Sequence, residues 1–217
     1  MLNPDGSTRF LLVRHGRTVA NARGLLSGRH DVELDAEGER QAAAVAEAVN
    51  RDLDGADARI VSSPLLRATR TAAAIAEAWA TDPAAPASVD VDDRFVEMDY
   101  GEWDGRPLGE VPAAAWRSWR VDPGFCPPGG ETLAAVTERV SAALRELTLA
   151  NPGRSVVVTS HVSPIKAAIT WALGVDDAAT WRMRLTNASI SEVLVSPDRS
   201  GALHATMVRF NDTAHLR

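Results

Sequence analysis

The sequence predicts an α/β fold: a three-layer αβα sandwich with a mostly parallel central sheet. Short apolar runs such as residues 10–13 and 155–159 alternate along the chain with stretches of helical periodicity. Strands that alternate with helices form a mostly parallel sheet whose two faces are both covered by helices. The chain has 217 residues, which suits one domain that buries roughly 70% of its unfolded surface. We therefore expect a single domain over residues 1–217.

The first half of the chain contains two predicted strand–helix pairs. Phe10-Leu11-Leu12-Val13 is a short buried strand. Residues 36–52 form a helix with Asp35 as its N-cap, and its apolar face contains Ala42, Val45, Ala46 and Val49. Ile60-Val61 form the second strand. A helix with Pro64 in its first position then runs to about residue 80.

The second half repeats this alternation around one irregular segment. Residues 81–88 are predicted to form a loop, and the apolar residues Val89 and Val91 indicate a strand that leads to residues 95–97. Residues 98–130 are rich in Gly, Pro and Trp, and we expect a lid-like excursion over one edge of the sheet. The remaining predicted elements are a helix at 131–150, a strand at 155–159, a helix at about 163–173, and strands near 189–195 and 203–210.

Composition restricts the classes of partner. The chain has 29 acidic and 23 basic side chains and a net charge of −6, which argues against a nucleic-acid or anionic-membrane surface. The single cysteine, Cys126, excludes an internal disulfide framework and fits a reducing compartment. The N-terminal residues do not resemble a signal peptide, and no apolar run approaches the length of a membrane span. We therefore expect a cytoplasmic protein.

Motifs for metal or nucleotide chemistry are missing from the sequence. There is no cysteine pair, no H-E-x-x-H, no carboxylate run with calcium-loop spacing and no glycine-rich phosphate loop. We therefore expect no bound metal and no cofactor.

Polar and cationic side chains follow three predicted strands at the point where each strand ends. Arg14-His15-Gly16 follows the first strand, and Ser62-Ser63 follows the second, with Arg67 early in the next helix. Ser160-His161 follows the strand at 155–159. In open α/β sheets, ligands bind outside the carboxyl ends of the strands. Each residue alone is more often a capping or surface residue. Packing, however, does not require two arginines and two histidines at one edge of the sheet.

Binding of a small anion does require such a cluster. Arginine can grip phosphate oxygens in pairs, and helix N-termini add N–H donors that favour a bound phosphate. A neutral histidine is also available as a nucleophile near neutral pH. The strand-end residues therefore predict a pocket for a small anion rather than a polyanion.

Several motifs in order carry a family resemblance. They are Arg14-His15-Gly16-x-Thr18-x-x-Asn21, GRHDVELDAEGERQA at 28–42, SSPLLRATRTA at 62–72, VEMDYGEWDG at 96–105, PPGGET at 127–132 and Ser160-His161. This pattern resembles the histidine phosphatase superfamily, in its phosphoglycerate mutase-like branch, from residue 9 to about residue 195. Arg-His-Gly alone is a weak signal, but this many motifs in the right order form a strong one.

The resemblance implies a role for each matching residue. His15 would be the nucleophile that forms a phosphohistidine, with Arg14, Arg67 and His161 around the phosphoryl oxygens. Glu97 would protonate the leaving oxygen and then activate water. The resemblance also implies a set of substrate-binding residues, namely Asn21, Ser27, Gly28 and the backbone N–H of Val162.

Glu97 competes with three other carboxylates in its segment, at Asp99, Glu102 and Asp104. The residue types alone do not choose among them. Glu97 is preferred because it follows the apolar pair Phe95-Val96 and occupies the family position. A carboxyl group beside a phosphate dianion can keep the proton that a leaving alkoxide needs.

Other polar and aromatic residues are expected to have different roles. His30, His204 and His215 are not expected to be catalytic, although the loop of His30 could border the pocket. Arg70 follows Arg67 by one helical turn and is predicted to be a surface charge. The remaining aromatic residues belong either to the core or to the substrate opening, and they are Trp103, Trp116 and Trp119.

Three functions remain open from the sequence. We expect a phosphatase that hydrolyses a small phosphorylated metabolite. The segments SHVSPIK and PPGGET are similar to those of the branch that includes alpha-ribazole phosphatase-like enzymes. The alternative is a cofactor-dependent phosphoglycerate mutase, which the compact 98–130 segment disfavours because it offers only Arg106, Arg117 and Arg120. A non-catalytic phosphate-ester binder would not need a nucleophile and an acid together. Homodimer formation is left open.

Overall fold

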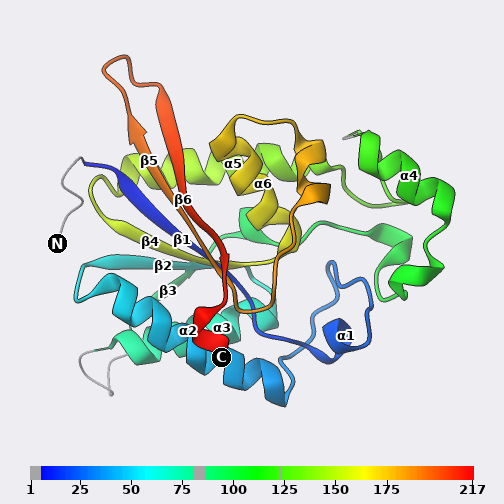
Figure 1. Cartoon of the computed structure of the whole chain (residues 1–217), viewed down its shortest axis with the longest axis horizontal. Coiled ribbons are helices and arrows are strands. Elements are labelled where there is room, and N and C mark those ends of the chain that lie inside the picture. The colour runs from blue at the N-terminus through cyan, green and yellow to red at the C-terminus, as the bar shows by residue number, and fades with distance from the viewer. Residues whose placement is uncertain (1–5, 81–86, 123) are drawn as a thin grey trace.

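The computed structural model describes residues 6–80, 87–122 and 124–217. At its centre is a six-stranded sheet in the order β3-β2-β4-β1-β5-β6 (Figure 1). The strands are β1 (Thr8–Arg14), β2 (Ala58–Ser62), β3 (Val89–Val91), β4 (Ser155–Ser160), β5 (Ile190–Pro197) and β6 (Leu203–Asp212). The first four strands pair in parallel, and β5 and β6 are antiparallel to their neighbours. The predicted mostly parallel sheet is confirmed.

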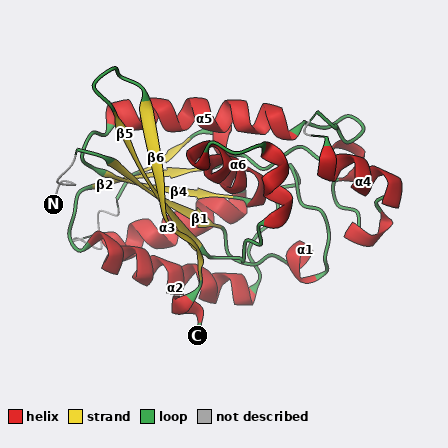
Figure 2. Ribbon diagram, turned by 45° about the horizontal axis from the view of Figure 1, so that its top comes forward, coloured by secondary structure: helices red, strands yellow, loops and turns green. Residues whose placement is uncertain are grey.

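Helices cover both faces of the sheet (Figure 2). Helices α2 (Ala36–Leu53) and α3 (Leu66–Trp79) pack together on one face, and α5 (Leu133–Ala150) and α6 (Val162–Leu173) pack together on the other. Figures 1 and 2 both show the two pairs on opposite sides of the strands. This arrangement is the predicted three-layer sandwich.

Strand β1 shows how the sequence supplies two cores at once. Successive side chains of a strand point to opposite faces of the sheet. Phe10 and Leu12 belong to the core on the α5/α6 side, whereas Leu11 and Val13 belong to the core on the α2/α3 side. The continuous apolar run is therefore explained by burial on both faces.

Helix boundaries follow the capping residues closely. The Asp35 side chain accepts a hydrogen bond from the Gly38 N–H and caps α2 as predicted. Thr132 caps α5 in the same way through the Ala135 N–H. The helix after β2 begins later than predicted: Leu65 is extended and α3 starts at Leu66, so Pro64 precedes the helix instead of opening it.

The predicted excursion at 98–130 contains little regular structure. Its elements are the short 3-10 helices η2 (Gly101–Trp103) and η3 (Leu108–Glu110) and the helix α4 (Ala113–Val121). Backbone hydrogen bonds join this excursion to the loop after α1 (Val19–Ala22), including Leu26 N–H to Arg106 O at 2.8 Å. Figure 1 shows α4 at the end of the molecule opposite the N-terminus, on the same side as α1.

The remaining short elements are 3-10 helices. They are η1 (Asp93–Phe95), η4 (Asp177–Arg182) and η5 (Ala214–Leu216). The loop predicted at 81–88 lies mostly outside the described residues. Across the described parts of the chain, no helix is both long and apolar enough to cross a membrane.

Candidate active site

The two histidines of the predicted site lie side by side because their strands are neighbours. Strands β1 and β4 pair in parallel with Arg14 opposite Ser160, so the next residues, His15 and His161, leave the sheet together. Their ring centroids are 5.0 Å apart, and both side chains are buried. The carboxyl edge of the sheet therefore unites residues that are far apart in the sequence.

The His15 ring is held in one orientation by its own loop. Its Nδ1 lies 2.7 Å from the Gly16 carbonyl oxygen. A carbonyl can only accept, so Nδ1 carries the proton and Nε2 keeps its lone pair when the ring is neutral. Burial, assisted by the charges of Arg14 and Arg67, holds the pKa of His15 well below its usual range. His15 is therefore a neutral imidazole with a free Nε2 near neutral pH.

The His161 ring has the opposite tautomer. Arg67 Nε lies 3.2 Å from His161 Nδ1, and because arginine can only donate, this nitrogen is the acceptor. Nε2 then carries the proton and donates to Ser63 Oγ at 2.7 Å. Burial, with the charge of Arg67 second, lowers the pKa of His161 well below its usual range. The second histidine is thus also neutral, and both of its ring nitrogens are hydrogen-bonded within the protein.

Arg67 organises the loop at 27–30 as well as His161. Its side chain is fully buried and donates to three backbone carbonyls, those of Ser27 (3.2 Å), Gly28 (2.8 Å) and His30 (2.8 Å). Asp104 accepts hydrogen bonds from backbone N–H groups of the same loop, from Gly28 to His30. A side chain at position 28 would not fit, since a Cβ there would lie 2.8 Å from the Met98 carbonyl oxygen. The loop is therefore held from both sides.

Arg14 has hydrogen-bonding capacity that the protein does not use. Its Nη1 donates to the Leu185 carbonyl at 2.6 Å, but its buried Nε has no hydrogen-bond partner among the described residues. Burial lowers the pKa of Arg14 to about 10, with the Glu97 carboxylate opposing that shift. A buried guanidinium donor without a partner is costly, and an anion in the adjacent space would satisfy it.

Glu97 lies at the start of α6. Its carboxylate accepts hydrogen bonds from the backbone N–H groups of Met98 (2.7 Å), Val162 (3.1 Å) and Ser163 (3.1 Å). The side chain is buried, although it lines the central cavity of the site. Of the four carboxylates in its segment, Glu97 is the one that lines this cavity.

A cavity of about 370 Å³ joins these groups. The residues that line it include Arg14, His15, Asn21, Ser27, Glu97, Val162 and Asn187. Arg67, His161 and Gly28 are not among the lining residues and lie behind it, where they support the histidines and the loop. The candidate site residues are thus close together, but they form two layers.

Helix N-termini contribute less free N–H capacity than the sequence suggested. The Val162 N–H, expected to bind substrate, is hydrogen-bonded to Glu97. At the start of α3, the Leu66 N–H donates to Asp31 at 2.7 Å. The positive groups directed toward the cavity are therefore side chains, chiefly that of Arg14.

Two asparagines on the cavity wall hold each other. Asn187 Nδ2 donates to Asn21 Oδ1 at 3.0 Å and to the His15 carbonyl at 3.3 Å. Asn21 Oδ1 also accepts from the Thr18 N–H, which leaves the Asn21 amide protons as its free donors. Sequence reasoning missed Asn187, which precedes β5; only the antiparallel direction of β5 brings it beside His15.

The remaining histidines and Arg70 lie away from the cavity. His204 and His30 have exposed side chains, and Arg70 is exposed beside Glu39. His215 Nε2 donates to the Ala188 carbonyl at 2.8 Å and so binds the C-terminal segment to the rest of the protein. His30 contributes its backbone, not its ring, through the bond to Arg67.

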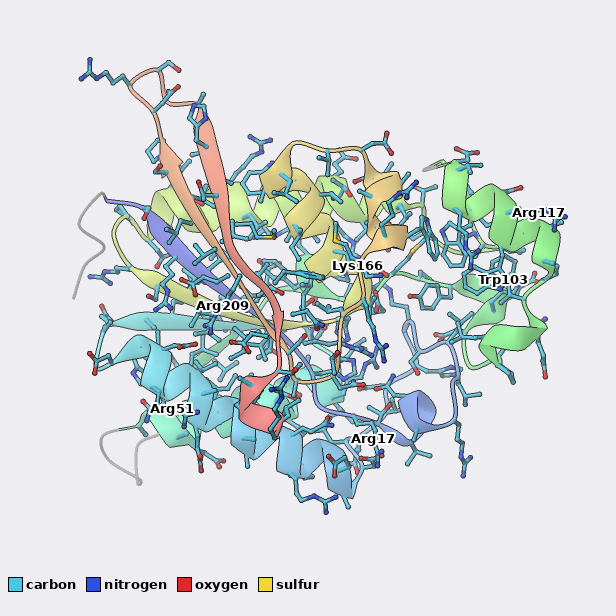
Figure 3. The ribbon with its side chains drawn as sticks, viewed as in Figure 1. Arg17, Arg51, Trp103, Arg117, Lys166 and Arg209 are labelled. Atoms are coloured by element: carbon cyan, nitrogen blue, oxygen red, sulfur yellow. The ribbon has the colours of Figure 1, made fainter. Side chains whose placement is uncertain are left out.

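The tryptophans of the excursion lie in the core, in the lining of a second cavity, or in both. Trp103 and Trp119 are buried members of the core on the α5/α6 side. Trp116 is only partly buried and, together with Trp119, lines a second cavity beside the first. Arg117, in contrast, is an exposed residue of α4 (Figure 3).

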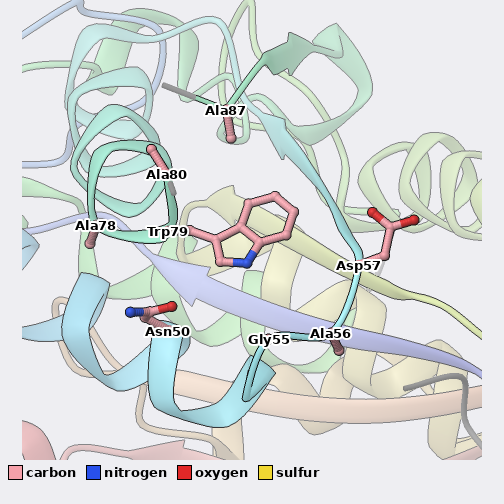
Figure 4. Close-up of a pocket in the computed structure, with 8 residues that line it drawn as sticks. All are labelled: Asn50, Gly55, Ala56, Asp57, Ala78, Trp79, Ala80 and Ala87. Carbon is pink, nitrogen blue, oxygen red and sulfur yellow. The ribbon is translucent and has the colours of Figure 1, made fainter. Parts of the chain in front are cut away.

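A separate hollow lies at the opposite end of β2 (Figure 4). Trp79 projects into it, and Asn50 and Asp57 are among its lining residues. It has a volume of about 560 Å³, yet no histidine or arginine belongs to its lining. The groups that could bind phosphate are therefore at the other end of the strand. In the described residues, no group of three His, Cys, Asp or Glu side chains could hold a metal ion.

The family model of the histidine phosphatase superfamily (branch 1) matches residues 10–212. The chain belongs to this superfamily. A bifunctional protein of Mycobacterium tuberculosis is 38% identical over 187 residues, which cover 85% of this chain and 49% of that protein. The chain thus spans about half the length of the first curated relatives it matches.

Two further comparisons extend over almost the whole chain. Phosphoserine phosphatase 1 of Hydrogenobacter thermophilus is 34% identical over 213 residues, covering 96% of this chain and 94% of the relative. A solved structure of a mycobacterial glucosyl-3-phosphoglycerate phosphatase in complex with VO3 has a TM-score of 0.82 at 28% identity. That match covers 94% of this chain and 99% of the other.

Proposed function

We propose that the protein is a phosphomonoester hydrolase that acts on a small phosphorylated metabolite through a phosphohistidine intermediate. The observation that carries this proposal is the cavity lined by a neutral His15, by Arg14 and by the carboxyl group of Glu97. These groups supply a nucleophile, an anion-binding cation and a proton donor. The names of the relatives, which include phosphoserine and glucosyl-3-phosphoglycerate phosphatases, support the same reaction class.

In the first step, His15 Nε2 attacks phosphorus and forms an N–P bond as the bond from phosphorus to the leaving oxygen breaks. The Nδ1–H bond to Gly16 orients the ring for this attack and stabilises the positive charge that develops on it. Arg14 balances the charge on the phosphoryl oxygens. Arg67 holds His161 and the loop at 27–30 in place through its hydrogen bonds. Protonated Glu97 transfers its proton to the leaving oxygen, so an alcohol departs.

In the second step, water attacks the phosphohistidine from the side that the alcohol has left. The Glu97 carboxylate takes a proton from this water, the N–P bond breaks, and inorganic phosphate forms. The electron pair of that bond returns to His15 Nε2, and protonated Glu97 is regenerated. Both steps thus use the same three groups, with Glu97 acting first as acid and then as base.

The choice of phosphatase over mutase rests on the excursion. A cofactor-dependent mutase must hold the second phosphate group of a bisphosphorylated intermediate while the phosphoryl group is returned. Arg106, Arg117 and Arg120 are all exposed, and none of them lines the cavity that contains His15. We further propose that the chain acts in the cytoplasm without a metal, as a single domain in which residues 98–130 cover the substrate like a lid.

A phosphate-release screen over a library of phosphorylated metabolites tests this proposal, with His15→Ala as the blank. We expect release from at least one small ester by the wild type and none above background by the variant. Absence of release across the library, or equal release by both proteins, would contradict it. Adding 3-phosphoglycerate with 2,3-bisphosphoglycerate separates the alternatives, because isomer formation faster than phosphate release would identify a mutase.

A further inference from the structure

A second, smaller pocket adjoins the catalytic cavity. It has a volume of about 140 Å³ and shares Leu26, Tyr100, Leu108 and Val162 with the cavity that contains His15. Val162 is also one of the residues whose N–H binds Glu97. A phosphate ester seated on His15, with its leaving oxygen near Glu97, would therefore extend its alcohol toward this pocket.

Aromatic rings form much of the wall of this smaller pocket, which we call the aromatic pocket. Trp116 and Trp119 are stacked with centroids 5.4 Å apart, and Trp181 packs edge-on against both at 5.8 and 5.2 Å. Tyr100 packs edge-on against Trp119. An apolar cavity of about 150 Å³ is known to hold one benzene molecule, so this pocket has room for roughly one ring. Its walls favour an apolar or aromatic group.

Three of the residues that line this pocket carry a buried polar atom without a partner among the described residues. Nε1 of Trp119, Nε1 of Trp181 and Oγ1 of Thr180 are buried without a hydrogen-bond partner in the part of the chain that the structure describes. All three residues line the pocket. An indole N–H can only donate and a hydroxyl can donate, so these atoms need an acceptor that the described residues do not provide. Leaving such groups unsatisfied is costly, which indicates that a ligand provides the acceptor.

Lys166 adds a positive charge to the same lining (Figure 3). It is the only lysine in a chain that otherwise uses arginine, and it lies on α6. Its ammonium group forms no hydrogen bond or ion pair with any described residue. Burial lowers the pKa of Lys166, and the nearby Glu97 carboxylate opposes that shift. An anionic group of a ligand would offset the same desolvation.

We propose that the aromatic pocket binds the leaving-group side of the substrate and selects phosphate esters whose alcohol joins an apolar or ring-shaped part to a carboxylate held by Lys166. This inference rests on the proposed phosphatase function. A single carboxylate matches the single ammonium, whereas a second phosphate would leave excess negative charge in an apolar pocket. The indole and hydroxyl donors complete the recognition of its oxygens.

A matched pair of substrates tests the charge recognition. We would measure kcat/KM for benzyl phosphate and 4-carboxybenzyl phosphate, which differ only in the carboxylate. The wild type is expected to prefer the carboxylated ester by roughly 10- to 100-fold, and Lys166→Met is expected to remove most of that preference. Arg70→Met, which deletes an exposed charge on α3, is the control and should keep the preference of the wild type. Equal rates for both esters, or an unchanged ratio in Lys166→Met, would overturn the inference.

Thr180→Val tests the unpartnered hydroxyl separately. The change keeps the shape of the side chain and removes a buried polar atom, so the urea midpoint should stay the same or rise. The preference for the carboxylated ester should fall by roughly 2- to 10-fold. If the ratio of kcat/KM does not move, the hydroxyl serves bound water alone and the recognition of a carboxylate by Thr180 is wrong.

A binding measurement keeps the two proposals distinguishable. If neither ester is hydrolysed by the wild type, the proposed function fails, but the pocket can still be tested with product alcohols. Titration with 4-(hydroxymethyl)benzoate should give a saturable change in tryptophan fluorescence. The Kd from this titration should be about tenfold lower than the Kd for benzyl alcohol. Lys166→Met should abolish that difference. Equal binding of both alcohols would contradict the aromatic pocket as a carboxylate site.

Discussion

The cavity that contains His15, which we call the phosphate cavity, and the aromatic pocket lie next to each other but are built differently. The first uses residues at the carboxyl ends of β1 and β4, and Arg67 and His161 behind it are tied to one another and to the backbone. The second uses residues of the excursion, α6 and η4, and three of its buried polar atoms have no partner in the described parts of the chain. In the cavity that contains His15, the Arg14 Nε is the buried polar atom without a partner among the described residues. In the aromatic pocket, three such atoms lack a partner among the same described residues.

This difference separates chemistry from specificity. Phosphoryl transfer needs the same nucleophile, cation and acid for every ester, so a rigid sheet edge suits these groups. Recognition of the alcohol differs from one ester to the next, and its groups lie on segments with less regular structure. Substitutions in the phosphate cavity should therefore affect all esters alike, whereas substitutions in the aromatic pocket should change their ranking.

Glu97 lies between the two regions, and its replacement should have the largest effect on turnover. Glu97→Gln removes the proton donor, so turnover of an alkyl phosphate is expected to fall by about 10²- to 10⁴-fold. Hydrolysis of p-nitrophenyl phosphate should fall far less, because its leaving group hardly needs a proton. Steady-state rates on both esters provide the measurement. Equal losses on the two would count against the role of Glu97 as an acid.

Arg67→Lys tests whether a change beside the cavity that contains His15 affects all esters alike. Lysine keeps the charge but cannot bind His161 and three carbonyls at once as the guanidinium does. We expect kcat/KM for benzyl and 4-carboxybenzyl phosphate to fall by the same factor, about 10²- to 10³-fold. The matched control is Arg70→Lys, one turn later and exposed. A change in the ratio of the two esters in Arg67→Lys would mean that the two regions are not separate.

Sequence reasoning predicted that His15 and His161 lie at one edge of the sheet, and the reason is physical. Parallel strands end at one edge, so residues that follow strands, such as His15 and His161, meet wherever the strands pair. The same reasoning missed Asn187 and the Leu185 carbonyl, because they precede β5, and only the antiparallel pairing of β5 with β1 places them there. It also could not foresee that the Val162 N–H is occupied by Glu97.

The aromatic pocket was beyond prediction for a different reason. Its rings come from α4, from η4 and from the segment around Tyr100, and no hydrophobic period connects these parts of the chain. Lys166 lies on α6, and its significance depends on the absence of a partner among the described residues, which is a property of the folded molecule.

The buried histidines should make stability depend on pH, which is a smaller effect than either loss of catalysis. The pKa values of His15 and His161 are lowered in the folded protein, so below about pH 6.5 the unfolded chain binds protons that the folded protein does not. The free energy of unfolding should therefore fall as the pH decreases below about 6.5, by up to roughly 1.4 kcal/mol per pH unit for each histidine. Urea unfolding between pH 5 and 8 should show a shallower slope for His161→Gln. An unchanged slope would mean that His161 takes up protons in the folded state.

The most direct test of the central role of His15 is to trap the intermediate. The wild type would be mixed with a radiolabelled phosphomonoester, quenched, and digested to locate the label. We expect acid-labile, base-stable phosphate on His15, and none on His15→Ala under the same conditions. An unlabelled wild type that still releases phosphate, or a label that persists in His15→Ala, would contradict that role.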